Sequence, residues 1–182
     1  MGKASRPFLG PIFIAFAVAG ASSAGPYEDA VAAHERADYA TATRLWRPLA
    51  ERGDPAAQLM LGSMFHDGLG VPQDFAEALN WFRRAADQGN ARAQSRVGRM
   101  YQSGSGVAQD YAWALYWYRK AAEQGDATAQ GSLGAMYSSG QGVAKDYAEA
   151  ASWGSVRNVV GIRSDVISEK LTISYYAARS NC

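Results

Sequence analysis

Few residues of this chain have side chains suited to catalysis or metal binding. Its 182 residues include two histidines, His34 and His66, and one cysteine, Cys182. A catalytic site needs a nucleophile, a base and a group that orients the base, and a structural zinc site needs four ligands. Asp146 and Glu149 form a carboxylate pair, but the spacing Asp-x-x-Glu is typical of a helix N-terminus. The sequence therefore predicts no catalytic residue, no metal site and no cofactor.

Motifs that hold phosphates or activate a serine are also missing from the sequence. The segment Gly68-Leu69-Gly70 lacks the third glycine of a dinucleotide-binding loop. The chain has neither the Gly-Lys-Ser/Thr of a phosphate-binding loop nor the Gly-x-Ser-x-Gly of a hydrolase. The sequence thus favours a protein that is not an enzyme.

Three stretches of the chain align with one another at a fixed offset of 36 residues: 55–90, 91–126 and 127–162. A period of this length is typical of a solenoid built from repeated units. A looser half-unit, 27–54, precedes them. Residues that match between the three units include Gly62/Gly98/Gly134, Phe65/Tyr101/Tyr137, Gly70/Gly106/Gly142, Asp74/Asp110/Asp146 and Trp81/Trp117/Trp153.

Each unit is expected to form a hairpin of two helices. Apolar residues at helical spacing predict a first helix over 55–66, and the glycines of 68–71 then turn the chain. Asp74 is placed to cap a second helix, which runs from Phe75 to about Gln88. Gly62 lies inside the first helix, where glycine is unfavourable, so a partner helix is expected to pass close to it.

The pattern from Ala57 to Gly89 carries a specific resemblance. It reads Ala-x-x-x-Leu-Gly-x-x-Phe-x-x-Gly-x-Gly-Val-x-x-Asp-x-x-x-Ala-x-x-Trp-x-x-x-Ala-Ala-x-x-Gly, and it resembles the Sel1-like repeat, a relative of the tetratricopeptide repeat. The resemblance implies an all-α fold, a right-handed α/α superhelix of antiparallel helix hairpins. It also implies a scaffold or adaptor role, and many bacterial members of the family are exported.

The two ends of the chain differ from the repeats. Lys3 and Arg6 precede the apolar run Phe8 to Ala19, which predicts a cleavable signal peptide over 1–24, with an uncleaved anchor or a disordered tail as alternatives. The repeat domain is expected over 25–162, and a capping helix and tail over 163–182. The protein is then periplasmic or secreted, with no stable membrane insertion after cleavage.

The charge of the mature chain argues against nucleic acid as a partner. Removing Lys3 and Arg6 from the 18 basic residues leaves 16, against 17 acidic residues, so the net charge is −1. Nucleic-acid binding needs a basic face. We therefore expect a protein or peptide partner.

Positions that vary between units form a stripe along the first helices, where solenoids commonly bind partners. This stripe has an apolar end, a centre with two arginines and an end made of small residues. Such a surface would suit an extended peptide or a helix with an acidic residue near its middle. The alternative is that these positions are solvated and vary freely. The stripe comprises Leu59, Met60, Ser63 and His66, then Ser95, Arg96, Arg99 and Gln102, then Gly131, Ser132, Ala135 and Ser138.

A second candidate lies on the second helix of the middle unit. Trp113 stands where the neighbouring units carry Glu77 and Glu149, and Tyr116 is one turn further on. An exposed Trp/Tyr pair is a common interface anchor. The alternative is that the two rings cover a neighbouring repeat or the terminal helix.

These patterns leave three functional hypotheses. The first is an exported adaptor that binds a protein of the cell envelope and regulates a sensor or an assembly complex. The second is a binder or weak hydrolase of cell-wall fragments, in which Tyr101, Tyr137 or Trp113 stack on sugars. The third is self-association through residues 163–182.

Overall fold

The computed structural model describes residues 25–153, and this part of the chain consists of eight α-helices with no strand. The predicted signal peptide and the predicted capping helix lie outside the described residues. The helices are α1 (Pro26–Glu35), α2 (Tyr39–Glu51), α3 (Pro55–Asp67), α4 (Phe75–Asp87), α5 (Ala91–Ser103), α6 (Tyr111–Glu123), α7 (Ala127–Ser139) and α8 (Tyr147–Trp153).

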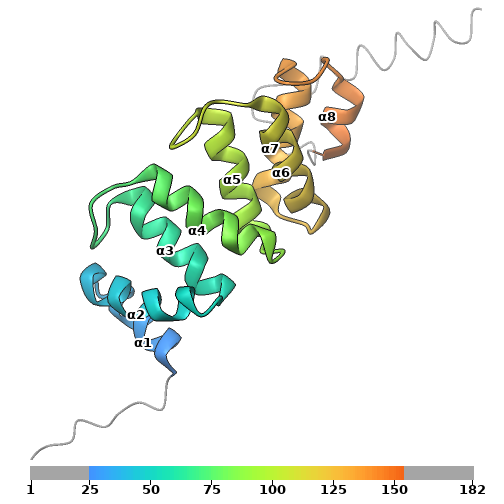
Figure 1. Ribbon diagram of the computed structural model, residues 1–182. Helices are drawn as coiled ribbons and strands as arrows, with labels where there is room; N and C mark the ends of the chain where they lie inside the picture. The colour runs from blue at the N-terminus through green and yellow to red at the C-terminus, as the bar shows by residue number, and fades with distance from the viewer. Residues whose placement is uncertain (1–24, 154–182) are drawn as a thin grey trace, which may run out of the picture.

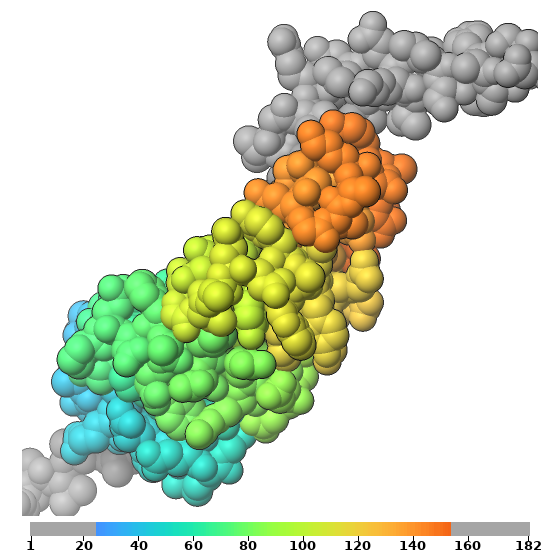
Figure 2. Space-filling view, turned by 45° about the horizontal axis from the view of Figure 1, so that its top comes forward, coloured from blue at the N-terminus to red at the C-terminus, as the bar shows by residue number. Residues whose placement is uncertain are grey.

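Successive helices form hairpins that stack in chain order (Figure 1). Each helix packs mainly against the helices before and after it in the sequence. The space-filling view shows the resulting elongated body, in which the units follow one another from the blue to the orange end (Figure 2). Contacts limited to neighbouring units are the defining property of a solenoid. The prediction of an all-α solenoid with 36-residue repeats is confirmed.

The helix boundaries follow the predicted caps. The Asp74 carboxylate accepts a hydrogen bond from the backbone N–H of Glu77 (2.9 Å) at the start of α4. Asp110 does the same for two N–H groups at the start of α6. A carboxylate at this position satisfies backbone donors that have no partner inside the helix. The first helix ends one residue later than predicted, and the second ends at Asp87 rather than near Gln88.

Glycines allow the helices of a hairpin to approach closely. A Cβ atom on Gly62 would lie 2.6 Å from the ring of Phe82, and one on Gly98 would lie 2.8 Å from the ring of Tyr118. Both rings are buried and come from the second helix of the same unit. The predicted close approach at Gly62 is therefore confirmed, because no other residue leaves room for these rings.

Buried glutamines connect each unit to the next. Gln94 on α5 donates a hydrogen bond to the carbonyl of Ala86 on α4 (3.0 Å), and its own side-chain oxygen accepts one from Gln124 (2.8 Å). Gln58 makes the matching pair of bonds, to the Ala50 carbonyl and from Gln88. These bonds satisfy polar groups at the joints between hairpins and so hold the units in one relative orientation.

Candidate functional site

Three arginines lie on one side of α5 and form the most basic surface on the first helices. Arg92, Arg96 and Arg99 are spaced at i, i+4 and i+7, so their side chains share one helix face. Arg92 and Arg99 are exposed and Arg96 is half-buried. Within residues 25–153 none of the three guanidinium groups forms an ion pair. We call this set the arginine stripe.

The arginine stripe borders a small depression between α5 and the start of α7. The depression has a volume of about 80 Å³ and includes Ser95, Asp126 and Thr128 in its lining. Burial lowers the pKa of Arg96, and the nearby charge of Arg99 lowers it further, while the carboxylates of Asp67 and Asp126 act in the opposite direction. The positive charge of Arg96 is thus poorly solvated and repelled by its neighbour, and a bound carboxylate would relieve both effects.

Other positions of the predicted stripe differ in accessibility. Leu59 and Ser95 are 8% and 6% exposed, so the expectation that they line an open surface is wrong for these two. Both are covered because neighbouring helices of the stack pack against this side of α3 and α5. Arg99 and Ala135 are exposed, whereas the other residues of the predicted stripe are partly buried, namely Met60, Ser63, His66, Arg96, Gln102, Gly131, Ser132 and Ser138.

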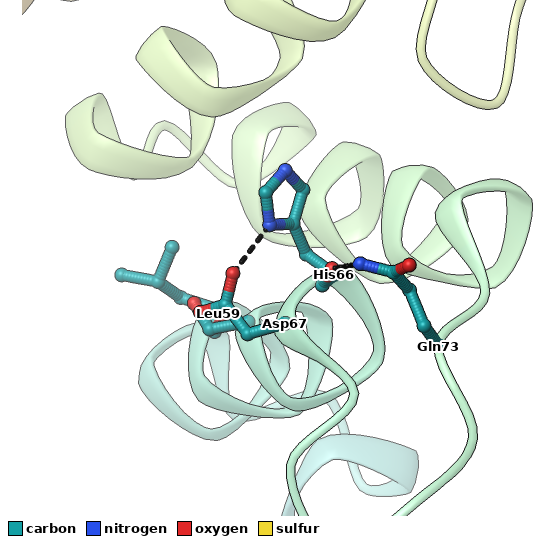
Figure 3. A network of polar contacts seen from close by, with 5 residues as sticks. Leu59, His66, Asp67 and Gln73 are labelled. Atoms are coloured by element: carbon teal, nitrogen blue, oxygen red, sulfur yellow. Dashed lines mark hydrogen bonds and ion pairs between the residues drawn. The ribbon is translucent and has the colours of Figure 1, made fainter.

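His66 lies at the end of α3, beside Asp67 and near Gln73 of the following loop (Figure 3). Its Nδ1 atom is 2.6 Å from the Asp67 carboxylate, and its ring packs against those of Phe75 and Phe82, at centroid distances of 5.3 and 6.5 Å. The backbone carbonyl of His66 accepts a hydrogen bond from Gln73 (2.8 Å) in the following loop. In the described part of the chain no hydroxyl or thiol group hydrogen-bonds the ring, so the contacts of His66 are those of a packing residue.

The corresponding residue of the next unit, Gln102, is also engaged within the fold. Its side-chain oxygen accepts a hydrogen bond from the Tyr118 hydroxyl (2.9 Å), and its side-chain nitrogen donates one to Gln141 (3.2 Å). Its backbone carbonyl accepts a bond from Gln109 (2.7 Å), as His66 does from Gln73. The backbone carbonyl at this position therefore holds the loop between the two helices in both units through a glutamine side chain.

Trp113 and Tyr116 lie on the exposed side of α6, each 45% exposed. Trp113 stacks on Tyr101 with ring centroids 6.0 Å apart and meets Tyr116 edge-on at 5.3 Å. The Lys120 ammonium lies 4.8 Å from the centre of the Tyr116 ring. The two rings are held in place by their neighbours while half of their surface faces solvent.

A family model described as Sel1 repeat matches residues 55–90, 91–126 and 127–154. These stretches make up more than half of the chain. The chain belongs to the Sel1 repeat family. The predicted family is thus confirmed, and the third Sel1 repeat extends one residue beyond the end of α8.

Two solved structures of the same fold are similar to this Sel1 repeat chain. One is a protective antigen present in uropathogenic Escherichia coli strains and displaying an SLR fold, which is 41% identical with a TM-score of 0.67. The match covers 70% of this chain and 28% of that one. The other is a Sel1 repeat protein from Oxalobacter formigenes, 34% identical with a TM-score of 0.67, and the match covers 71% of this chain and 52% of that one. No curated protein sequence matches the chain.

The tyrosines proposed to stack on sugars are enclosed by the Sel1 repeats. Tyr101 and Tyr137 are 7% exposed, because Trp113 lies on the first and the Arg119 guanidinium donates a hydrogen bond to the hydroxyl of the second. The prediction that these two rings offer an open face is wrong. Of the three aromatic residues proposed for sugar binding, Trp113 alone has a substantially exposed ring.

Aligning the three units in the sequence did not identify two features of the repeats. Arg92 belongs to the arginine stripe, and the signal that could have found it is its position one helical turn before Arg96. A groove of about 440 Å³ runs beside α6, with Tyr116 and Tyr137 in its lining. No pattern in the sequence indicated this groove, because it forms where α6 meets the loop of the following unit.

Over 25–153 no group of three or more His, Cys, Asp and Glu side chains is arranged to hold a metal ion. His34 packs its ring against Tyr39 and Trp46, at 5.3 and 5.6 Å. Over the same range no helix has the length and apolar character needed to cross a lipid bilayer.

Proposed function

We propose that this Sel1 repeat chain is an exported, non-catalytic scaffold that binds an acidic segment of another cell-envelope protein along the arginine stripe. Sel1 repeat proteins generally mediate protein–protein interactions. The partner would be the extracytoplasmic domain of a sensor or a component of an assembly complex. Export is supported by Lys3, Arg6 and the apolar run that follows them.

The observation that carries this proposal is the state of Arg96. It is half-buried in the middle of α5, its pKa is lowered by burial, and it forms no ion pair within residues 25–153. An unpaired, partly desolvated guanidinium costs free energy in the free protein, and a carboxylate from a partner would form strong charge-assisted hydrogen bonds with it. Arg92 and Arg99 extend the same charge along the helix, so a segment with two or more acidic residues fits best.

A photo-crosslinking experiment in cells tests the proposal. A photoreactive residue replaces Arg99 in the full chain with its own N-terminus, and the envelope fraction is analysed by mass spectrometry. A second chain carries the residue at Trp113, and a third at Arg83, an exposed position on α4 that serves as the control. We expect a discrete protein adduct at Arg99 that is absent at Arg83.

Two further measurements make the result decisive. Arg96→Glu is expected to abolish the adduct at Arg99, whereas Arg83→Glu leaves it unchanged. An adduct that survives Arg96→Glu, or a folded and exported chain that gives no adduct at Arg99, would refute the role of the arginine stripe. Recovery of the full chain in the cytoplasm alone would refute export.

A further inference from the structure

Ser95 is a buried serine whose hydroxyl has no partner inside the described fold. The residue is 6% exposed and lies on α5 between Arg92 and Arg99. Every other serine within a helix of residues 25–153 donates a hydrogen bond to a backbone carbonyl three or four residues earlier, as Ser63 does to Leu59 (3.1 Å). Serines inside helices commonly bond their own backbone in this way. The Ser95 hydroxyl forms no such bond and lines the depression beside the arginine stripe, so it is available to a group that enters there.

The Ser95 hydroxyl and the Arg96 guanidinium offer hydrogen-bond donors to the same small space. Both residues line the depression between α5 and the start of α7, and Thr128 adds a second hydroxyl. Arg96 is half-buried and forms no ion pair within residues 25–153. The one carboxylate in the lining is that of Asp126, and its Oδ1 atom already accepts the backbone N–H of Ala129 (2.8 Å). The depression is therefore rich in donors and suited to an oxyanion.

This combination of a hydroxyl and a cation occurs in the middle unit alone. Ser95 corresponds to Leu59 in the first unit and to Gly131 in the third. The position of Arg96 carries no cation in either neighbour. The packing of one repeat on the next thus requires neither residue, and both are free to serve a binding site.

The size and the charge of the depression favour a carboxylate. Its volume of about 80 Å³ is close to that of three water molecules at about 30 Å³ each, which suits a carboxylate with the methylene next to it. Arg96 lies within the electrostatic influence of two further arginines, Arg92 and Arg99, and of two carboxylates, Asp67 and Asp126. Three positive and two negative charges leave an excess of one positive charge. A group with one negative charge balances this excess, whereas a phosphate dianion would be repelled more strongly by the two aspartates.

We propose that the depression binds a single carboxylate, from an aspartate or glutamate side chain of the partner, which accepts hydrogen bonds from the Ser95 hydroxyl and the Arg96 guanidinium. The proposal rests on the proposed function, since this carboxylate belongs to the acidic segment that binds the arginine stripe. Other acidic residues of the segment pair with Arg92 and Arg99, which are exposed. One carboxylate is buried on binding and the others stay at the surface, so the buried one contributes most to specificity.

Titration with sodium acetate, followed by NMR, tests the proposal on the isotope-labelled chain from residue 25 to residue 182. Acetate carries one carboxylate, and acetamide is its neutral counterpart of the same shape. The reporters are the backbone N–H signals of Ser95 and Arg96 and the Nε–H signal of Arg96. At about pH 7 and constant ionic strength, we expect acetate to shift all three signals saturably below about 100 mM and acetamide to leave them unchanged. No saturable shift with acetate, or an equal shift with acetamide, would overturn the proposal.

Inorganic phosphate is the competing ligand in the same titration. We expect it to bind more weakly than acetate, because of Asp67 and Asp126. Tighter binding of phosphate would assign the depression to a phosphoryl group and refute the proposal.

Three variants locate the bound acetate. Ser95→Ala removes the hydroxyl without adding volume and should weaken acetate binding by about tenfold, because hydrogen bonds to charged groups are strong. Ser63→Ala is its matched control, since the Ser63 hydroxyl is bonded to the Leu59 carbonyl, and it should bind acetate like the native chain. Arg96→Gln removes the charge and should abolish the saturable shift at Ser95. Unchanged affinity in Ser95→Ala would show that the hydroxyl takes no part in binding.

The photo-crosslink at Arg99 separates this proposal from the proposed function. We expect Ser95→Ala to reduce the adduct at Arg99 in cells. An adduct that is lost in Arg96→Glu but undiminished in Ser95→Ala would mean that the stripe binds a partner and the carboxylate site is wrong. Acetate binding as expected, with no adduct in cells, would support the carboxylate site and refute the proposed function.

Discussion

Replacing Gly106 by alanine should destabilise the fold far more than the same change at Gly89. Both glycines have positive φ, +71° at Gly106 and +90° at Gly89. A Cβ atom on Gly106 would lie 2.5 Å from the backbone carbon and oxygen of Phe75, at the start of α4 in the preceding unit. A Cβ atom on Gly89 would have nothing within 4 Å. The pair therefore separates the cost of close approach from the cost of the backbone conformation.

The expected magnitudes follow from these two terms. A left-handed backbone costs alanine about 1–2 kcal/mol, and alanine recovers about 0.4–1 kcal/mol by restricting the unfolded chain. Gly89→Ala should thus lower the free energy of unfolding by about 1 kcal/mol. At Gly106 the atoms in conflict belong to the backbone, which cannot rotate away, so an overpacking cost of about 1–3 kcal/mol is added.

Urea unfolding followed by circular dichroism at 222 nm measures the difference. With a slope of about 1–3 kcal/mol per molar urea, Gly106→Ala should unfold at a midpoint about 1 M lower than Gly89→Ala. Equal midpoints for the two variants would refute the reasoning, because they would show that the joint between units adjusts to the extra atom at no cost.

Three further predictions concern caps, buried amides and pH. Asp110→Ala removes the cap of α6 and should lower the free energy of unfolding by about 0.5–2 kcal/mol, and an unchanged melting temperature would contradict this. Gln94→Ala removes two hydrogen bonds at the joint between units, one to the Ala86 carbonyl and one from Gln124, and should lower the free energy of unfolding by about 1–3 kcal/mol in urea unfolding. Burial raises the pKa of Tyr118 above its ordinary value, so the native chain should lose stability as the pH rises above about 10, while Tyr118→Phe should lose less, because the raised pKa of Tyr27 acts in both proteins. Urea midpoints measured from about pH 8 to 11 should therefore converge for these two proteins, and a constant gap would refute the shift.

The repeat pattern was enough to predict the hairpins, because its signals are local. Asp74 at the start of a helix, the glycine pair that turns the chain and the apolar spacing of 55–66 each act within one or two helical turns. The close packing at Gly62 was also predictable, since a glycine repeated inside a helix implies that another helix leaves no room for a side chain. The exposure of Trp113 followed from its place among polar residues of the other units.

Burial between units depended on the tertiary structure. Leu59 and Ser95 vary between repeats as surface residues do, yet they are buried, because variation in sequence does not reveal how near the adjacent helix lies. Tyr101 and Tyr137 are equally buried, but different neighbours cover them. The Trp113 ring stacks on Tyr101, whereas the Arg119 guanidinium donates a hydrogen bond to the hydroxyl of Tyr137.

The sequence by itself determined that the chain is a helical solenoid and where the helices of the full repeat units begin, since these depend on contacts close along the chain. Only the packing of one unit on the next decided which side chains are accessible and left a groove beside α6. The physical reason is that accessibility depends on distances between hairpins, and those distances are set by the side chains of both units together.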